Sequence, residues 1–461
     1  MPKPVSRRRF VSSAGAAAGC LLSAMIVPRH VLGGPRNIPP SEKLNVAGVG
    51  VGGKGSEDLA KLAHENIVAL CDVDSDYSAD CIKRQIQHFP HAAKLFARAK
   101  HYTDYRVMLD KQQDIDAVLI ATPDHTHAVI TLAAMRAGKH VYTQKPLTHS
   151  VAEARLLAQA AKQCKVVTQM GIQGHSFEGI RLLTEWFQAG VLGEVRQVDA
   201  WCSLSYYPWG HAGWSPKWSE RPKETPPVPK NLDWDLWIGP APMRPYHRAY
   251  HPVSWRSWWD FGNGMMGDRG VHTFDPFYSA LKLTAPTSVE ATTCGNTAET
   301  HPLSSIVTFQ FPTRGPLPPV KVTWYEGTCP PRPAELEDDR KMPAEGGFFV
   351  KGSKATVMAG VYGDSPQIIP AAKMRDITLP AKTLPRARVC HEEEWARACK
   401  GGQPGGADFA YAGPLTEVCL LGNVAKRVDA RLQWDAAAMK ITNLAEANVL
   451  RRTEYRKGWS L

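Results

Sequence analysis

The sequence predicts an α/β fold whose N-terminal part is a doubly wound parallel sheet. Short apolar runs alternate with helical patterns from residue 44 to residue 170, which is typical of repeated β-α-β units. A glycine-rich turn follows the first apolar run, and an acidic residue ends the second. A chain of 461 residues is also too long for one ordinary core, so a second domain is expected.

The glycine-rich turn lies between the first predicted strand, 44–49, and a helical pattern. Glycines permit a tight turn and close approach to a pyrophosphate, whose charge is favoured by the N–H groups at a helix start. The second predicted strand, 66–71, ends at Asp72, whose carboxylate would accept both ribose hydroxyls and repel a 2′-phosphate. NAD is therefore predicted as the cofactor in preference to NADP. The glycines form the pattern Gly48-x-Gly50-x-x-Gly53, with Gly52 inside it.

Three later strands end in polar or loop-forming residues. The predicted strands are 116–121, 140–143 and 166–170. Because the carboxyl ends of parallel strands line the ligand crevice of a doubly wound sheet, the residues that follow them are candidate cofactor contacts. These residues are Thr122, Pro123, His127, Lys145 and Gln173.

Three motifs together resemble the Gfo/Idh/MocA family, to which glucose–fructose oxidoreductase and inositol dehydrogenase belong. The resemblance covers roughly residues 43–290, and the C-terminal stretch is similar to an exported bacterial branch. It implies a Rossmann domain followed by an α/β domain with a large open, mainly antiparallel sheet, which often makes dimer or tetramer contacts. The motifs are the glycine turn with Asp72, the loop Thr122 to His127 followed by Gln144-Lys145-Pro146, and the segment 264–275.

The resemblance also implies a catalytic centre at Lys145, Asp268 and His272. Oxidation of a secondary alcohol needs a base for the hydroxyl proton, and a histidine titrates near neutrality. Asp268 lies one helical turn before His272 and would orient its imidazole or hold a neighbouring hydroxyl, while Lys145 would donate to the substrate oxygen. The alternative is a structural Asp–His pair and a surface lysine. Gln144 replaces the family's usual glutamate, which either lowers the pKa of Lys145 or reflects a habit of this branch.

An aromatic-rich stretch at about 201–261 contains nine of the fourteen tryptophans. Flat aromatic faces stack on sugar rings, so this loop-rich insertion is typical of a carbohydrate cleft, with Tyr207 and Trp259 as candidate substrate contacts. Asp275 is a third candidate, for a substrate hydroxyl, unless it caps the structure locally. The alternative is that the aromatic residues pack on one another or on a partner subunit. Nearby cations would meet an acidic sugar or be solvated loop charges: Lys217, Arg248, Arg256 and Arg269.

Residues 1–34 are predicted to be an export signal. Ser6-Arg7-Arg8-Arg9-Phe10-Val11 matches the twin-arginine pattern and precedes a short, weakly apolar run, although an ordinary secretory signal or an uncleaved anchor is the alternative. Twin-arginine transport exports folded proteins, so the cofactor would be bound before the protein reaches the periplasm. The segment carries five of the eleven net positive charges, and the modest remainder argues against nucleic acid as a partner.

These observations predict a signal at 1–34, an NAD-binding domain at 35–166 and a substrate and oligomerisation domain at 167–461. Amphipathic helices are expected at 391–399 and 415–428. The predicted function is hydride transfer between a nicotinamide cofactor and a sugar or polyol hydroxyl, in a homo-oligomeric dimer or tetramer. A redox-neutral NAD-dependent glycosidase or lyase and a non-catalytic sugar-binding protein are the alternatives. No metal site is predicted, because the histidine spacings fit no zinc pattern. No stable membrane span is predicted either, because the apolar run near the N-terminus is short and rich in alanine and glycine.

Overall fold

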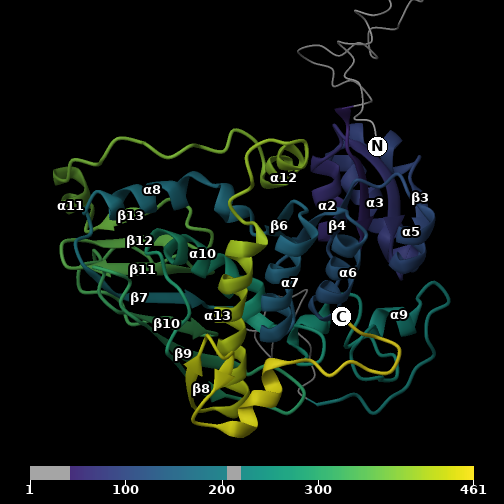
Figure 1. Ribbon diagram of the computed structural model, residues 1–461. Helices are drawn as coiled ribbons and strands as arrows, with labels where there is room; N and C mark the ends of the chain where they lie inside the picture. Colours follow the sequence, from purple (N-terminus) through teal and green to yellow (C-terminus); the bar gives the residue numbers. More distant parts are fainter. Residues whose placement is uncertain (1–41, 205–219) are drawn as a thin grey trace, which may run out of the picture. The chain divides into compact units, whose positions relative to one another are not determined.

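The structure, a computed structural model, describes residues 42–204 and 220–461 (Figure 1). Residues from Leu44 onward form one compact unit built on two sheets. The predicted export signal and Tyr207 lie outside the described residues. Within the described ranges, no helix combines the length and apolarity needed to cross a membrane.

The first sheet has six parallel strands in the order β3-β2-β1-β4-β5-β6, as expected for a doubly wound fold. The strand order reverses between β1 and β4, so a crevice opens at their carboxyl ends. The sheet includes β6, which lies beyond the predicted boundary at residue 166. The strands are β1 (Asn45–Val49), β2 (Asn66–Cys71), β3 (Lys100–Tyr102), β4 (Ala117–Ile120), β5 (His140–Gln144) and β6 (Thr168–Gly171).

Helices connect these strands. Apolar residues fill β1 and β4 because both faces of a parallel sheet are covered by helices. At the start of α7, the Glu153 carboxylate accepts the Ser150 N–H at 2.8 Å, which satisfies one donor that the helix leaves unpaired. The helices are α2 (Lys54–Lys61), α3 (Ser75–His88), α4 (Ala93–Phe96), α5 (Tyr105–Lys111), α6 (Asp124–Arg136) and α7 (Val151–Cys164).

The second sheet has nine strands in the order β13-β12-β11-β7-β10-β9-β8-β14-β15. Only the pair β10 and β7 is parallel among its pairings, which confirms the expected mainly antiparallel sheet. Its strands are β7 (Val195–Cys202), β8 (Ser288–Cys294), β9 (Ser304–Phe311), β10 (Val320–Glu326), β11 (Gly346–Gly352), β12 (Thr356–Gly360), β13 (Gln367–Ile369), β14 (Arg431–Asp435) and β15 (Lys440–Ile441).

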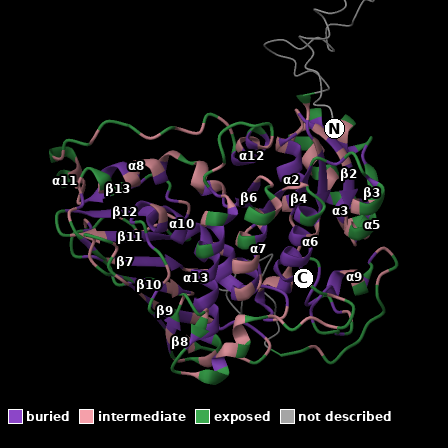
Figure 2. Ribbon diagram, in the orientation of Figure 1, coloured by how far each residue is buried: buried purple, intermediate pink, exposed green. Residues whose placement is uncertain are grey.

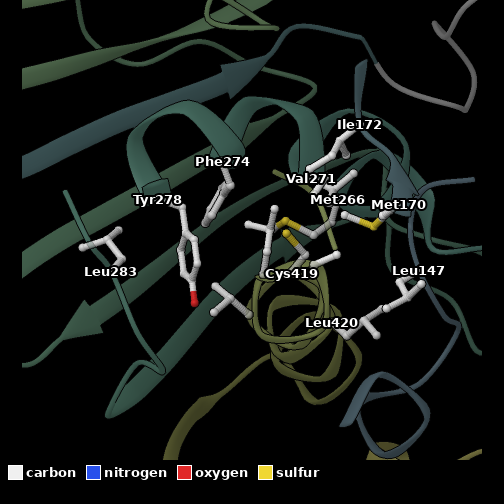
Figure 3. Packing of buried hydrophobic residues seen from close by; sticks show 14 of the residues in the cluster. Leu147, Met170, Ile172, Met266, Val271, Phe274, Tyr278, Leu283, Cys419 and Leu420 are labelled. Atoms are coloured by element: carbon white, nitrogen blue, oxygen red, sulfur yellow. The ribbon is translucent and has the colours of Figure 1, made fainter. Parts of the chain in front are cut away.

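The helices of this second part are α8, α10, α11 and α13, and α13 packs against both β8 and α7. Figure 2 shows α13 and the central strands as mostly buried. In Figure 3, Phe274 and Tyr278 of α10 lie on one side of α13, and Leu420 of α13 points toward Leu147 on the other. All of them belong, with Met170 of β6, to one apolar cluster. One continuous core therefore joins the two sheets. The helices are α8 (Glu178–Gln188), α10 (Val271–Ala280), α11 (Ala371–Asp376) and α13 (Phe409–Val428).

A helix from much later in the sequence covers part of the first sheet. This helix, α12 (His391–Cys399), packs against α2, β5 and β6. Trp395 is fully buried there, with its ring 5.6 Å from that of Tyr142. The cofactor-binding part is thus not contiguous in sequence, because its apolar face near β5 is covered by residues about 250 positions later.

The aromatic stretch packs largely on itself, which was the alternative to a carbohydrate cleft. Trp234 and Trp237 of α9 (Trp234–Ile238) stack with centroids 4.6 Å apart. Tyr250 and Trp258 join them in a separate buried cluster. The tryptophans described here serve mainly as the core of the insertion, since burying several aromatic rings stabilises a loop-rich segment that has no sheet of its own.

Replacing Trp395 by alanine is expected to lower the free energy of unfolding by about 3–5 kcal/mol, because it leaves a large cavity between α12 and the first sheet. Urea unfolding measures this change. Val449→Ala, at a side chain that is 71% exposed, is the control and should change stability by less than about 0.5 kcal/mol. Equal stability of the two variants would show that α12 does not dock as described.

Candidate active site

A single cavity of about 760 Å³ at the carboxyl end of the first sheet collects most of the predicted site residues. It reaches from the glycine turn to the start of α10. Strand ends of the first sheet and loops and helices of the second part of the chain both line it, so the second part closes the crevice predicted for the first sheet. The predicted residues that line it are Gly50, Gly52, Gly53, Asp72, Thr122, Pro123, Lys145, Gln173, Asp268 and His272.

The glycine pattern lies two residues later than predicted. Gly48 belongs to β1 and does not line the cavity, and a side chain there would collide with Leu59 of α2. Gly50 makes the turn at φ +76°, and its added Cβ would lie 2.7 Å from the Thr122 nitrogen. Gly55 lies against the Gly50 carbonyl, where any side chain would overlap it. The structural pattern is therefore Gly50-x-Gly52-x-x-Gly55, since the strand continues to Val49.

The residues around this turn fit a dinucleotide. Gly53 caps α2 without any side-chain hydrogen bond, so the N–H groups at the helix start remain available to a pyrophosphate. The Asp72 carboxylate accepts the N–H groups of Val51 at 2.8 Å, Gly52 at 3.0 Å and Asp74 at 3.0 Å. Roughly one of its four acceptor positions is left for a ribose hydroxyl, rather than the two expected from sequence.

The Lys145 side chain crosses from the end of β5 to the second part of the chain. Its ammonium donates to Asp268 at 2.6 Å from Oδ1 and at 2.9 Å from the backbone oxygen. Burial lowers the pKa of Lys145, and the negative charge of Asp268 opposes this. Burial alone would raise the pKa of Asp268, but Lys145, Arg256 and Arg269 hold it well below its usual range. The aspartate is therefore an anion in the site.

His272 lies beside this ion pair with a neutral ring. It is in the first turn of α10, directly after a π-helical segment (Met266–Gly270) that contains Asp268; such segments are frequent at functional sites. Burial, helped by the charge of Lys145, lowers the pKa of His272 well below its ordinary value. Among the described residues, none forms a hydrogen bond with its Nδ1. A neutral imidazole in this position can accept a proton.

Besides Gly48, three predicted contacts among the described residues do not line the cavity. His127 is buried, with Nδ1 2.8 Å from the Pro146 oxygen and Nε2 2.8 Å from the Thr122 oxygen. It therefore ties together two loops of the cavity wall instead of reaching it. Burial lowers the pKa of His127 to about 4, so the ring is neutral.

Asp275 and Trp259 also lie outside the wall of the cavity. The Asp275 carboxylate is fully buried and accepts from Tyr411 at 2.6 Å, with His175 Nδ1 at 2.7 Å, so it is held by residues distant in sequence instead of capping the structure locally. Trp259 donates to the Thr297 oxygen at 3.1 Å and lines a second cavity of about 330 Å³.

The structure adds residues that the sequence did not indicate. Tyr362 follows β12 and meets His272 edge to face, with ring centroids 4.8 Å apart. Phe177 lines the same cavity, and so does Trp255, which belongs to the aromatic-rich stretch that the sequence singled out. No motif marks Tyr362 or Phe177, because each is an isolated aromatic side chain that the fold alone brings to the site.

The structure explains why residue 144 is a glutamine where the family usually has a glutamate. Its Nε2 donates to Asp58 of α2 at 2.6 Å, and its Oε1 accepts the Lys145 N–H at 3.2 Å. Burial, with the nearby charge of Glu392, raises the pKa of Asp58 to about 7 although Lys54 opposes this. A glutamate at position 144 would put a third carboxyl beside two buried ones. An amide that donates to Asp58 avoids this repulsion.

Residues 44–172 match the family model described as the oxidoreductase family, NAD-binding Rossmann fold, and residues 184–310 match its C-terminal alpha/beta domain. The chain belongs to the Gfo/Idh/MocA oxidoreductase family. The cofactor class predicted from the sequence, NAD, is that of the family.

Curated relatives in the family match only part of this chain. A glycosyl hydrolase family 109 protein of Shewanella pealeana is 29% identical over 211 residues, which is 42% of this chain and 45% of that protein. Levoglucosan dehydrogenase of Pseudarthrobacter phenanthrenivorans is 32% identical over 104 residues, or 23% of this chain and 26% of that protein. The chain thus spans less than half the length of these relatives.

Solved structures show the same fold over most of the chain. The WlbA dehydrogenase of Bordetella pertussis, in complex with NADH and UDP-GlcNAcA, has a TM-score of 0.57 at 15% identity and covers 85% of this chain and 99% of its own. An inositol dehydrogenase homolog of Azotobacter vinelandii, with NADH and myo-inositol, has a TM-score of 0.53 at 16% identity, covering 85% and 98%. In the part of this chain that the structure describes, no group of three or more histidine, cysteine or acidic side chains is arranged to hold a metal.

Gln144→Glu is expected to destabilise the protein by about 1–3 kcal/mol at pH 8, because it buries a carboxylate beside Asp58. The pKa of the new glutamate would be raised in the folded state. The variant should therefore be nearly as stable as the parent at low pH, and its loss of unfolding free energy should grow as pH rises. Urea unfolding at pH 5 and pH 8 measures this difference.

Two further variants control the experiment. Asp58→Asn in the Gln144→Glu background should restore stability at pH 8, since the new amide can donate to the glutamate. Gln403→Glu, at an exposed position, should have no comparable effect. A Gln144→Glu variant as stable as the parent at both pH values would contradict the explanation.

Proposed function

We propose that this protein is an NAD-dependent oxidoreductase that acts on a secondary hydroxyl of a sugar or polyol. The observation that carries the proposal is the placement of Lys145, Asp268 and His272 in one cavity with the glycine turn and Asp72. A dinucleotide site and an acid–base group thus face the same space. This is the minimum that hydride transfer from an alcohol requires.

Each residue has a defined part in the reaction. NAD, when bound, supplies the acceptor for the hydride. The neutral ring of His272 takes the proton of the substrate hydroxyl, and the Lys145 ammonium donates a hydrogen bond to the same oxygen. Asp268 holds the Lys145 amine in place at 2.6 Å. Asp72 lies where a 2′-phosphate would meet its carboxylate, which favours NAD over NADP.

Export by the twin-arginine pathway and action in the periplasm are part of the proposal. The pattern at residues 6–11 supports export of a folded protein, which would carry its cofactor with it. A homo-oligomer with a small carbohydrate substrate is proposed from the resemblance to the family.

A redox-neutral glycosidase is the second candidate, favoured by the similarity to a glycosyl hydrolase family 109 protein. Transient oxidation of a sugar carbon acidifies the neighbouring C–H bond. The base at His272, after releasing the first proton to water, would then remove that C–H proton, and the aglycone would leave and take up a proton as an alcohol. Water would add to the resulting enone before the carbonyl is reduced again. Such a cycle needs no exchange of cofactor, which suits an exported enzyme.

The proposal predicts that His272→Asn lowers the rate of NADH formation from sugars or polyols by about 10²–10⁴-fold, because the base is removed. Single-turnover absorbance of the NAD-loaded protein measures this rate across a sugar panel. His101→Asn, at an exposed position, is the matched control and should leave the rate unchanged. Full activity of His272→Asn would refute the assignment. Release of aglycone from glycosides without net NADH would favour the glycosidase.

The pH dependence tests Lys145. The ordinary pKa of a lysine is 10.5, and burial lowers that of Lys145. In the direction of carbonyl reduction, the rate should therefore fall as pH rises through a pKa below 10.5, since the neutral amine lacks the positive charge that polarises the carbonyl oxygen. Lys145→Arg keeps its charge at all accessible pH values and should remove this alkaline limb. A limb that is unchanged in Lys145→Arg would assign it to another group.

A further inference from the structure

Three cations share one carboxylate in the cavity. Asp268 Oδ1 lies 2.6 Å from Lys145 Nζ and 3.6 Å from Arg256 Nε, and its Oδ2 lies 3.9 Å from Arg269 Nε. All four side chains line the same space. One negative charge therefore faces three positive charges within ion-pair distance, and an anionic ligand would be attracted to this region.

Other acids nearby offset little of this charge. Glu345 lies 3.7 Å from Arg269 Nη2, but its side chain is 70% exposed, so water and salt screen the pair. Burial raises the pKa of Asp124 to about 7, and this group is only partly ionised at neutral pH. The nearby Lys54 is itself paired, with Glu57 at 2.7 Å and Asp58 at 2.9 Å. A positive excess thus remains around Asp268.

Arg269 and Tyr362 lie on the side of the cavity next to the acid–base group. Arg269 Nη1 is 3.4 Å from the Tyr362 hydroxyl, and the Tyr362 ring meets that of His272 with centroids 4.8 Å apart. A hydroxyl that reacts at His272 would belong to a molecule that also reaches Arg269. The planar guanidinium suits an oxyanion, to which it can present two parallel N–H groups.

We propose that the substrate is a sugar or polyol that carries an oxyanion, with Arg269 and Tyr362 binding this group while the reacting hydroxyl lies at His272. This inference rests on the proposed function, because it names the class of substrate for the same site. A carboxylate and a phosphate have the same recognition chemistry here, and the experiment separates them. Arg269 is the residue that sets this specificity.

The test compares neutral and acidic partners of the same sugar. Glucose, glucuronate and glucose 6-phosphate, and galactose with galacturonate, are supplied to the NAD-loaded protein, and NADH formation and quenching of tryptophan fluorescence are recorded. The kcat/KM for an acidic sugar is expected to exceed that of its neutral partner by about tenfold to a hundredfold. The acid that reacts better, carboxylate or phosphate, identifies the group.

Variants assign the effect to Arg269. Arg269→Met should abolish the preference for the acidic sugar, chiefly through a higher KM for that sugar. Arg269→Lys should recover part of it, because the charge remains without the planar fork. Arg196→Met, at a side chain that is 61% exposed, is the matched control and should keep the preference.

The outcomes separate this inference from the proposed function. Equal kcat/KM for neutral and acidic partners, or an equal loss for both in Arg269→Met, would overturn the inference while NADH formation upholds the function. Binding of acidic sugars that depends on Arg269 but yields no NADH would support the inference and contradict oxidation. If no acidic sugar of the panel binds or reacts, the inference fails.

Discussion

The contact between Lys145 and Asp268 is the interaction on which the site depends. The lysine directly follows β5 of the first sheet, and the aspartate belongs to the π-helical segment before α10, so their 2.6 Å ion pair joins the two parts of the chain. Removing Asp268 would leave the buried ammonium of Lys145 without its ion-pair partner. The same contact sets the position of the amine relative to His272 and to the glycine turn.

Burial disfavours the charged form of all the neighbouring groups, and their partners decide which of them keep a charge. It removes the charge from His272, whose ring can then accept a proton, whereas Asp268 remains ionised because three cations surround it. Burial also lowers the pKa of Lys145, but its aspartate partner opposes this. One low-dielectric space thus holds a neutral base beside a charged donor, and neither state would follow from the residue types alone.

Elements with a strong local pattern were predicted correctly. The strands around the glycine turn and the helix at residues 391–399 are present. The mainly antiparallel second sheet, which the family resemblance implied, is present as well. The errors have a common origin in contacts across the chain. The glycine register depended on how far β1 extends, and Asp275 is held by Tyr411 and His175 rather than by any neighbour in sequence. The tryptophans of the insertion were recognised, but their packing on one another was only an alternative.

The sequence by itself determined the cofactor turn, the acid that ends β2 and the spacing of Asp268 from His272, because these depend on local chain geometry. Only the tertiary structure decided that α12 covers the first sheet, that Gln144 donates to Asp58, and that Tyr362 meets His272. Gln144 is 86 residues from Asp58 in the sequence, and Tyr362 is even farther from His272. Periodicity and motif spacing carry no information about which distant side chains a fold brings into contact.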